Sequence, residues 1–270
     1  MIVTGLAFLL SGISVAADVE GFQKRRGIQV DKPSAVTITV LYNNVPFDSR
    51  LTTAWGISCL VEGMEKTILF DTGGDGQILL SNMKKLGKNP EQIDVVILSH
   101  IHGDHVGGIW EFLKEKSNVE VYIPKSFHDN FKKRVKKTGA KVFSVGKPTE
   151  IGKNIYSTGQ MGAFMKEQAL VLRTAKGLAV VTGCAHPGVA NFVKRAKEIW
   201  KEDVYLVSGG FHLMAYSEQQ VERLIADLKR LDVKKVGPSH CTGGKPIEMF
   251  KRAWGKDFID LGCGASVTIP

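Results

Sequence analysis

The segment that most constrains this chain is residues 98–108, which carries His100, His102, Asp104 and His105 within six positions. It follows an apolar stretch at residues 93–98, which has the length of a strand covered on both faces. In extended backbone His100 and His102 point the same way, and Asp104 and His105 can face them from the turn into the next helix. Three imidazoles and a carboxylate are costly to bury unpaired, and they suit zinc, iron or manganese. The segment therefore predicts a transition-metal site at a strand end.

Short strands and amphipathic helices alternate along the rest of the chain. Strands are predicted at residues 36–42, 57–62, 67–70, 93–98, 119–123, 140–145, 169–173, 178–182, 204–208, 234–237 and 267–269. Helices are predicted at residues 77–86, 106–116, 126–138, 188–200, 217–231 and 246–254, and Ser217 with Gln220 forms a capping box for the fifth. Since no low-complexity linker interrupts residues 36–270, we expect one α/β domain with two sheets inside and helices outside.

The pattern H-x-H-x-D-H after a hydrophobic strand resembles the signature of the metallo-β-lactamase-fold hydrolases, and the likeness extends from about residue 36 onward. Residues 69–73, with Asp71, resemble the strand-end aspartate that supports the metal site in that family. Other segments resemble the dihydropterin ribofuranosylaminobenzene phosphate synthase-like branch of the superfamily; they are residues 41–44, 55–58, 183–188, 209–213 and 238–243. The resemblance implies a four-layer αββα sandwich of the metallo-β-lactamase type.

The resemblance also implies two divalent transition-metal ions, zinc in the first place, with iron or manganese as alternatives. His100 and His102 would bind the first ion, with His186 as its remaining ligand. Asp104 and His105 would bind the second ion, and His240 would join them.

Two positions depart from the usual family pattern. The usual bridging aspartate is absent, and Cys184 stands near its place. The family's isolated histidine before the hairpin of the strands at residues 169–173 and 178–182 is also missing, and Glu167 lies in that region. Cys184 is therefore either a thiolate ligand or a small buried residue, and Glu167 is a candidate for supporting the metal ligands or contacting the substrate.

Five residues are assigned individual roles. Asp104 is predicted to orient the nucleophile as well as to hold metal. His212 is predicted to contact substrate, with simple hydrogen bonding in a loop as the alternative. His128, in a lysine-rich helix, is expected to face solvent, Cys241 to pack in the interior, and Asp75 to cap a helix.

The function that these features predict is metal-dependent hydrolysis of a small ester or phosphoester by a metal-activated water, at a dinuclear site. One alternative is an iron-dependent oxidoreductase on the same fold. Another is a non-catalytic sensor or binding protein that retains the metal.

The charge balance favours a small partner. Lys and Arg total 36 against 27 Asp and Glu, a formal net charge of +9. These charges are scattered, apart from a run at residues 132–137 that fits the outer face of a helix. A basic surface suits an anionic small substrate, and without interleaved aromatic and basic residues no nucleic-acid partner is expected.

Residues 1–17 carry no charged side chain and end in small residues, which predicts a signal peptide and export to the periplasm or the cell exterior. A buried first element or a mis-chosen start codon is the alternative, and the protein would then be cytoplasmic. Residues 18–35 are predicted to be an N-terminal extension before the domain at 36–270. The apolar run within residues 1–17 is too short to predict a transmembrane helix. No stable membrane insertion is expected once the leader is removed. No C-x-x-C pair occurs among the four cysteines, and an exported protein could form a disulfide.

Overall fold

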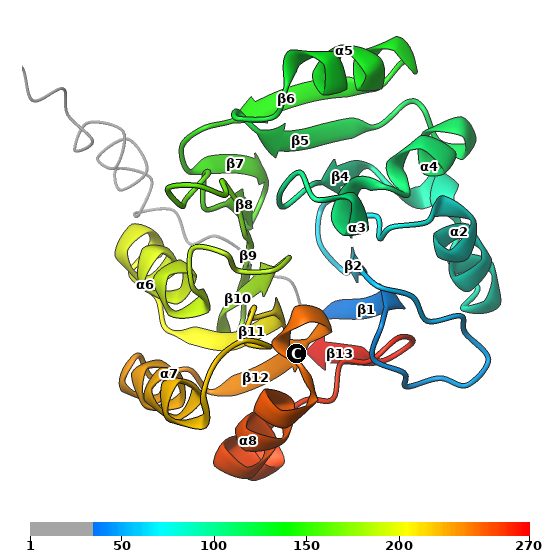
Figure 1. The fold of residues 1–270 in the computed structure, drawn as a ribbon. Helices are drawn as coiled ribbons and strands as arrows, with labels where there is room; N and C mark the ends of the chain where they lie inside the picture. Colours follow the sequence, from blue (N-terminus) through cyan, green and yellow to red (C-terminus); the bar gives the residue numbers. More distant parts are fainter. Residues whose placement is uncertain (1–34) are drawn as a thin grey trace, which may run out of the picture. The chain divides into compact units, whose positions relative to one another are not determined.

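Two β-sheets form the centre of the structure, a computed structural model that describes residues 35–270. The strands are β1 (Val36–Asn43), β2 (Ile57–Glu62), β3 (Ile68–Phe70), β4 (Val95–Ile97), β5 (Glu120–Pro124), β6 (Lys141–Val145), β7 (Thr149–Gly152), β8 (Ile155–Ser157), β9 (Leu170–Thr174), β10 (Gly177–Thr182), β11 (Val204–Gly210), β12 (Lys235–Ser239) and β13 (Ser266–Ile269). One sheet has the order β13-β1-β2-β3-β4-β5-β6, and the other has the order β12-β11-β10-β9-β8-β7 (Figure 1).

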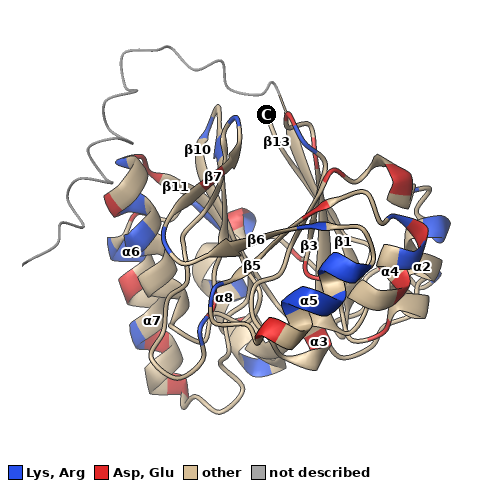
Figure 2. Ribbon diagram, turned by 90° about the horizontal axis from the view of Figure 1, so that it is seen from above, with Lys and Arg blue, Asp and Glu red and all other residues tan. Residues whose placement is uncertain are grey.

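Helices cover the outer faces of both sheets. The described helices are α2 (Gly76–Lys85), α3 (Gly103–Val106), α4 (Ile109–Glu115), α5 (Asp129–Lys137), α6 (Val189–Trp200), α7 (Glu218–Arg230) and α8 (Gly244–Trp254). Seen along the layers, α2, α4 and α5 lie on the side of the seven-stranded sheet, and α6 and α7 lie on the side of the other (Figure 2). This arrangement confirms the predicted αββα sandwich.

The main hydrophobic core lies between the two sheets. Successive side chains of a strand point to opposite faces of the sheet. In β4, Val95 and Ile97 enter the core between the sheets, whereas Val96 packs in the cluster beneath the outer helices. Both faces of β4 are therefore buried, and the strand holds the metal-ligand segment that follows it in a fixed position.

The prediction of one helix at residues 106–116 is wrong in its first turn. Gly107 and Gly108 separate two helices there, α3 and α4. A Cβ atom on Gly108 would lie 2.1 Å from the carbonyl oxygen of Thr72. Only glycine permits this approach. The close contact holds α3, which carries Asp104 and His105, against the loop that follows β3.

Strands β7 and β8 were not expected from the sequence. Each is short, and Asn154 turns the chain between them in the left-handed region, with φ 66°. The capping box of Ser217 and Gln220 at the start of α7 is confirmed.

The described residues fall within one unit, Lys32–Pro270. The predicted signal peptide at 1–17 and the extension at 18–35 lie outside the described residues, except for Ala35. Among the described helices, none has the length and apolar character needed to cross a membrane.

Candidate metal centre

The candidate site is built on loops at the carboxyl ends of strands. Asp71 follows β3, Ala185 follows β10, His212 follows β11 and His240 follows β12. All four have left-handed backbone, with φ of 56°, 58°, 56° and 51° in that order. Such backbone costs free energy in residues other than glycine and is concentrated at functional sites. The fold thus holds strained loops from both sheets at one edge.

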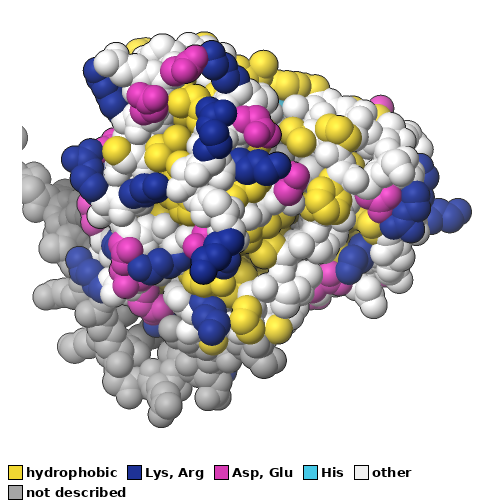
Figure 3. Space-filling model, turned by 90° about the horizontal axis from the view of Figure 1, so that it is seen from below, with side chains coloured by type: hydrophobic (Ala, Val, Ile, Leu, Met, Phe, Trp, Pro, Cys, Tyr) yellow, Lys and Arg dark blue, Asp and Glu magenta, His cyan; other side chains and the backbone are white. Residues whose placement is uncertain are grey.

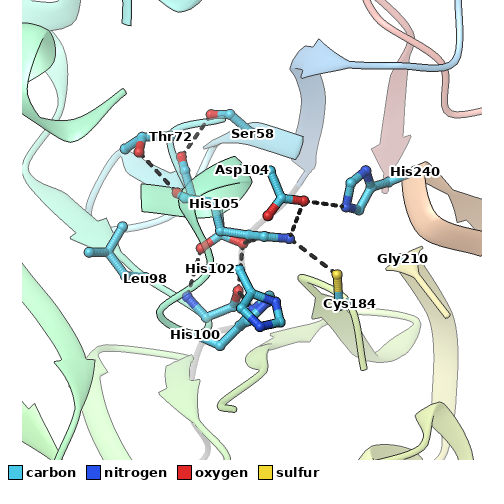
Figure 4. Close-up of polar contacts among 12 residues, drawn as sticks. Ser58, Thr72, Leu98, His100, His102, Asp104, His105, Cys184, Gly210 and His240 are labelled. Carbon is cyan, nitrogen blue, oxygen red and sulfur yellow. Dashed lines mark hydrogen bonds and ion pairs between the residues drawn. The ribbon is translucent and has the colours of Figure 1, made fainter. Parts of the chain in front are cut away.

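One group of possible ligand atoms comes from Asp104, His105, Cys184 and His240, all within 4.8 Å of one another (Figure 4). Asp104 Oδ2 lies 3.4 Å from His105 Nε2 and 3.3 Å from His240 Nε2. His105 Nε2 lies 3.2 Å from Cys184 Sγ. The group combines a carboxylate, two imidazoles and a thiol, which is a donor set for zinc or iron.

A second group contains His100, Cys184 and His186, whose possible ligand atoms also lie within 4.8 Å of one another. His102 borders it, with Nδ1 3.0 Å from His100 Nε2 and its ring centroid 4.9 Å from that of His186. Cys184 belongs to both groups. It stands between them, where a bridging ligand would lie.

A third group joins Cys184 to His212 and Cys241. The His212 ring lies 4.3 Å from that of His186, so it borders the second group as well. Cys241 is buried, as expected, but it lies beside the site rather than in the general core.

Asp71 orients two of the histidines. It is fully buried and accepts hydrogen bonds from Ser99 N and Ser99 Oγ, both at 2.6 Å. Asp71 Oδ2 also lies 2.8 Å from Nδ1 of His105, and Ser99 Oγ lies 2.9 Å from Nδ1 of His100. Contacts of this kind to Nδ1 turn Nε2 toward the site and set the ring tautomer.

Glu167 supports the loop that carries Cys184 and His186. Its carboxylate accepts hydrogen bonds from the backbone N–H groups of Cys184 (2.9 Å), Ala185 (2.8 Å) and His186 (2.9 Å). Burial raises the pKa of Glu167 to about 7, and the three N–H donors oppose that rise. Of the two roles considered for Glu167, the contacts favour support of the candidate ligands over contact with substrate.

The electrostatics favour the ligand forms of His100, His186 and Asp104, but not that of His105. Burial lowers the pKa of His186 to about 4 and that of His100 well below its usual range, so both imidazoles are neutral at pH 7. Burial also opposes the charge of Asp104, but its close contacts with the rings of His105 and His240 outweigh it and lower the pKa of this carboxyl. Burial lowers the pKa of His105, but Asp71 outweighs it and raises that pKa to about 10. A cation at Nε2 would therefore displace a proton from His105.

Two buried nitrogen atoms test whether a metal ion fits. The Nε2 atoms of His186 and His240 are inaccessible to solvent and have no hydrogen-bond partner among the described residues. His240 Nδ1 lies 2.7 Å from Asn44 Oδ1, which aims Nε2 at Asp104. A buried His186 Nε2 that makes no hydrogen bond, and a His240 Nε2 that lies 3.3 Å from the Asp104 carboxylate without forming one, fit a bound transition-metal ion.

A cavity of about 950 Å³ opens beside the second group, and His186 and His212 are among its lining residues. His212, which the sequence predicts to contact substrate, lies at the wall of this cavity. The cavity itself was missed from the sequence, because its walls come from a loop and a helix with no motif of their own.

The remaining residues lie as expected. Asp75 caps α2, since its side chain accepts hydrogen bonds from the N–H groups of Gln77 and Ile78. His128 is exposed at the start of α5. All four cysteines are buried and free.

Comparison with known proteins identifies the family. The model of the metallo-β-lactamase superfamily matches residues 58–190. A 7,8-dihydropterin-6-methyl-4-(β-D-ribofuranosyl)-aminobenzene-5′-phosphate synthase from Methanocaldococcus jannaschii is 33% identical over 271 aligned positions, which cover 82% of this chain and 90% of the relative.

Solved structures agree with this assignment. A metal-dependent hydrolase of the β-lactamase superfamily is 30% identical with a TM-score of 0.72, and the alignment covers 86% of this chain and 98% of that one. The short form of human tRNase Z is 13% identical with a TM-score of 0.58 over 87% of this chain and 99% of that one, a likeness of fold alone. This chain belongs to the metallo-β-lactamase superfamily, in the branch that resembles the dihydropterin ribofuranosylaminobenzene phosphate synthase.

Proposed function

We propose that this protein is a metal-dependent hydrolase that directs a metal-activated water, at a dinuclear centre, against a small ester or phosphoester. The observation that carries the proposal is the pair of ligand groups that share Cys184, each with a buried histidine Nε2 atom that makes no hydrogen bond. His100, His102 and His186 would hold one ion, and Asp104, His105 and His240 the other. Zinc is the ion proposed first.

Bound metal would supply an acidified water, with its pKa lowered from ~15.7 to about 7, and a positive charge to stabilise the developing anion. Side chains of the protein would orient the water and the substrate. Asp104, held as a carboxylate, accepts a hydrogen bond from the attacking water and directs it. His212 lies at the cavity wall, where it can donate a proton or a hydrogen bond to the substrate.

The charge distribution supports a small-molecule partner rather than nucleic acid. Lys and Arg side chains on the face in Figure 3 are separated by acidic and apolar side chains, and form no continuous basic track. Among the described residues, some basic side chains pair with acidic ones, as in the pairs of Lys235 with Asp257 at 2.9 Å and Lys197 with Asp203 at 2.9 Å.

A second candidate function follows from the methanogen relative, which is named a synthase of a ribofuranosyl phosphate. In that case an organic nucleophile would take the place of water at the same centre and displace a leaving group, which departs with its bonding electrons, from a phosphorylated small molecule. Both functions need the same ligands, and they differ in whether water alone consumes the substrate.

The test is metal analysis and hydrolysis by the full chain as purified. We expect about two transition-metal ions per chain and metal-dependent turnover of 4-nitrophenyl acetate or bis(4-nitrophenyl) phosphate. His102→Ala should abolish turnover with little loss of fold, while His128→Ala, an exposed histidine far from the ligand groups in sequence, serves as the matched control. Unchanged turnover in His102→Ala would reject the assignment.

Two further measurements separate the remaining alternatives. Iron in anaerobically purified protein together with oxygen uptake would favour an oxidoreductase, in which the Cys184 thiol is a ligand. A metal-loaded protein that binds small anions but turns over no ester, lactam or phosphodiester would favour a sensor or the synthase reaction.

A further inference from the structure

Two cysteine thiols lie together at the edge of the candidate metal centre, and the proposed reaction uses one of them. Cys184 follows β10 and is shared by the two ligand groups, whereas Cys241 follows β12 and is not among the ligands proposed for either ion. The two Sγ atoms and a ring nitrogen of His212 lie within 4.8 Å of one another, and both thiols are free. Cys241 Sγ also lies 3.7 Å from the carbonyl oxygen of Cys184. A disulfide needs a sulfur–sulfur distance of about 2 Å, so side-chain rotations and a small movement of the two loops would bring the sulfur atoms into bonding contact.

The order of the strands makes this approach of the two thiols depend on a glycine. Strand β11 lies between β10 and β12, so a side chain at the end of β11 would separate the loops that carry the cysteines. That position is Gly210, which lies beside Cys184 in Figure 4. A Cβ atom there would lie 2.7 Å from Cys241 Sγ and 3.2 Å from Cys184 Cα. Because glycine has no side chain, the space between the two cysteines is left to their sulfur atoms.

A small solute can reach these two sulfur atoms although both cysteine residues are buried. His212, whose ring nitrogen lies within 4.8 Å of both, is exposed and lines the cavity beside the second ligand group. The other two cysteines lie elsewhere: Cys59 packs in the core between the sheets, and Cys263 is fully buried. Of the four thiols, Cys184 and Cys241 are therefore the pair that a reagent in the cavity would reach.

We propose that Cys184 and Cys241 form a site of oxidative modification, at which a peroxide closes a disulfide bond and removes the Cys184 thiolate from the metal centre. One thiolate attacks a peroxide oxygen and becomes a sulfenic acid as hydroxide leaves. The second thiolate attacks that sulfur, the S–S bond forms and a second hydroxide leaves. The two protons released by the thiols convert both hydroxides to water, so hydrogen peroxide is reduced as the two thiols are oxidised.

Oxidation and metal binding should exclude one another at Cys184. The thiolate is the form of cysteine that binds metal, and a disulfide has no thiolate. The same thiolate is the nucleophile that attacks a peroxide, so a metal ion that holds it also protects it. This exclusion rests on the proposed function, whereas formation of the bond rests only on the positions of the two cysteines.

The experiment treats the full chain with hydrogen peroxide, as purified and after removal of metal with a chelator, and maps its cysteines by non-reducing peptide mass spectrometry. We expect a linked Cys184–Cys241 peptide that forms faster after metal removal and that dithiothreitol cleaves. Zinc affinity, measured by chelator competition, should fall on the order of tenfold or more on oxidation and return on reduction. Cys59→Ala, which removes a thiol from the core, is the matched control and should leave the linked peptide unchanged.

Two variants identify the partners in the bond. Cys184→Ser and Cys241→Ser should each abolish the linked peptide, and dimedone should trap the cysteine that remains as its sulfenic acid. The peptide map of the wild type tests the bond even if a variant fails to fold. Free Cys184 and Cys241 in the peroxide-treated, metal-depleted wild type would overturn the modification site, as would a link from either one to Cys59 or Cys263. Equal rates of oxidation in metal-loaded and metal-depleted protein would overturn the exclusion between the bond and the metal.

The outcome for the bond is distinct from the outcome for hydrolysis. If the linked peptide forms in a protein that holds no metal as purified and turns over no ester, the modification site stands and the hydrolase assignment fails. If the protein is a metal-dependent hydrolase in which both thiols stay free under peroxide after metal removal, the hydrolase assignment stands and the modification site fails.

Discussion

The loop that carries Cys184 and His186 should depend on Glu167. Its carboxylate is fully buried and accepts three backbone N–H groups at 2.8–2.9 Å. Above the pKa of about 7, where Glu167 is a carboxylate, hydrogen bonds to this charged group contribute about 1.5–3 kcal/mol each. Glu167→Gln keeps a carbonyl oxygen for the N–H groups of Cys184 and Ala185, but it places an NH₂ donor against the N–H of His186. Glu167→Ala removes all three acceptors.

Hydrogen exchange of these three amides is the direct assay. Since about 1.4 kcal/mol is a factor of ten, the amide of His186 should exchange at least tenfold faster in Glu167→Gln. In Glu167→Ala the amides of Cys184, Ala185 and His186 should all accelerate by a similar or larger factor. Metal content should fall in the same order, from wild type to Gln to Ala.

The control is Glu222→Ala, an exposed glutamate on α7, which should change neither exchange nor metal content. If Glu167→Ala preserves the protection of the three amides and the metal content of the wild type, then the loop is held by other contacts. The role given to Glu167 would then be wrong.

Three further predictions concern single positions. Gly108→Ala should destabilise the protein by about 3 kcal/mol or more in urea unfolding, because its Cβ would meet Thr72 O at 2.1 Å; a midpoint equal to that of wild type would contradict this. Cys59 should resist iodoacetamide at pH 8 in the folded protein, since burial raises its pKa to about 12, and modification of the native protein would refute the burial argument. Because this folded pKa lies above the ordinary value of 9.0, ionisation favours unfolding, and the stability contribution of the protonated thiol is lost as pH rises from 9 toward 12. Asp71→Asn should weaken zinc affinity by about 10- to 100-fold in a chelator competition, because an amide cannot accept from Ser99 and also hold His105; equal affinity would show that Asp71 does not orient the ligands.

The sequence alone predicts those candidate ligands that lie close together in the chain. His100, His102, Asp104 and His105 follow one buried strand, so local spacing alone predicts that they converge. The strands and helices also followed from hydrophobic periodicity. Where the prediction failed, at the break between α3 and α4, a long-range contact of Gly108 with Thr72 decided the outcome.

Contacts between segments that lie far apart in the sequence could not be predicted in the same way. Nothing in the pattern around Glu167 indicates that its carboxylate accepts three N–H groups some 17 to 19 residues later. In the sequence α6 resembles an ordinary amphipathic helix, and only the structure shows that it lines the same cavity as the loop at residues 161–165. Short strands β7 and β8 lack the length that makes a twofold repeat recognisable.

The central claim is that this chain holds two metal ions at the strand-end loops. Anomalous scattering from crystals of the protein as purified tests it most directly, because it locates each ion and identifies the element. Two peaks are expected, one at bonding distance from His186 Nε2 and the other from His240 Nε2, with Cys184 between them. A structure with no anomalous peak at these residues, in protein that has kept its fold, would contradict it.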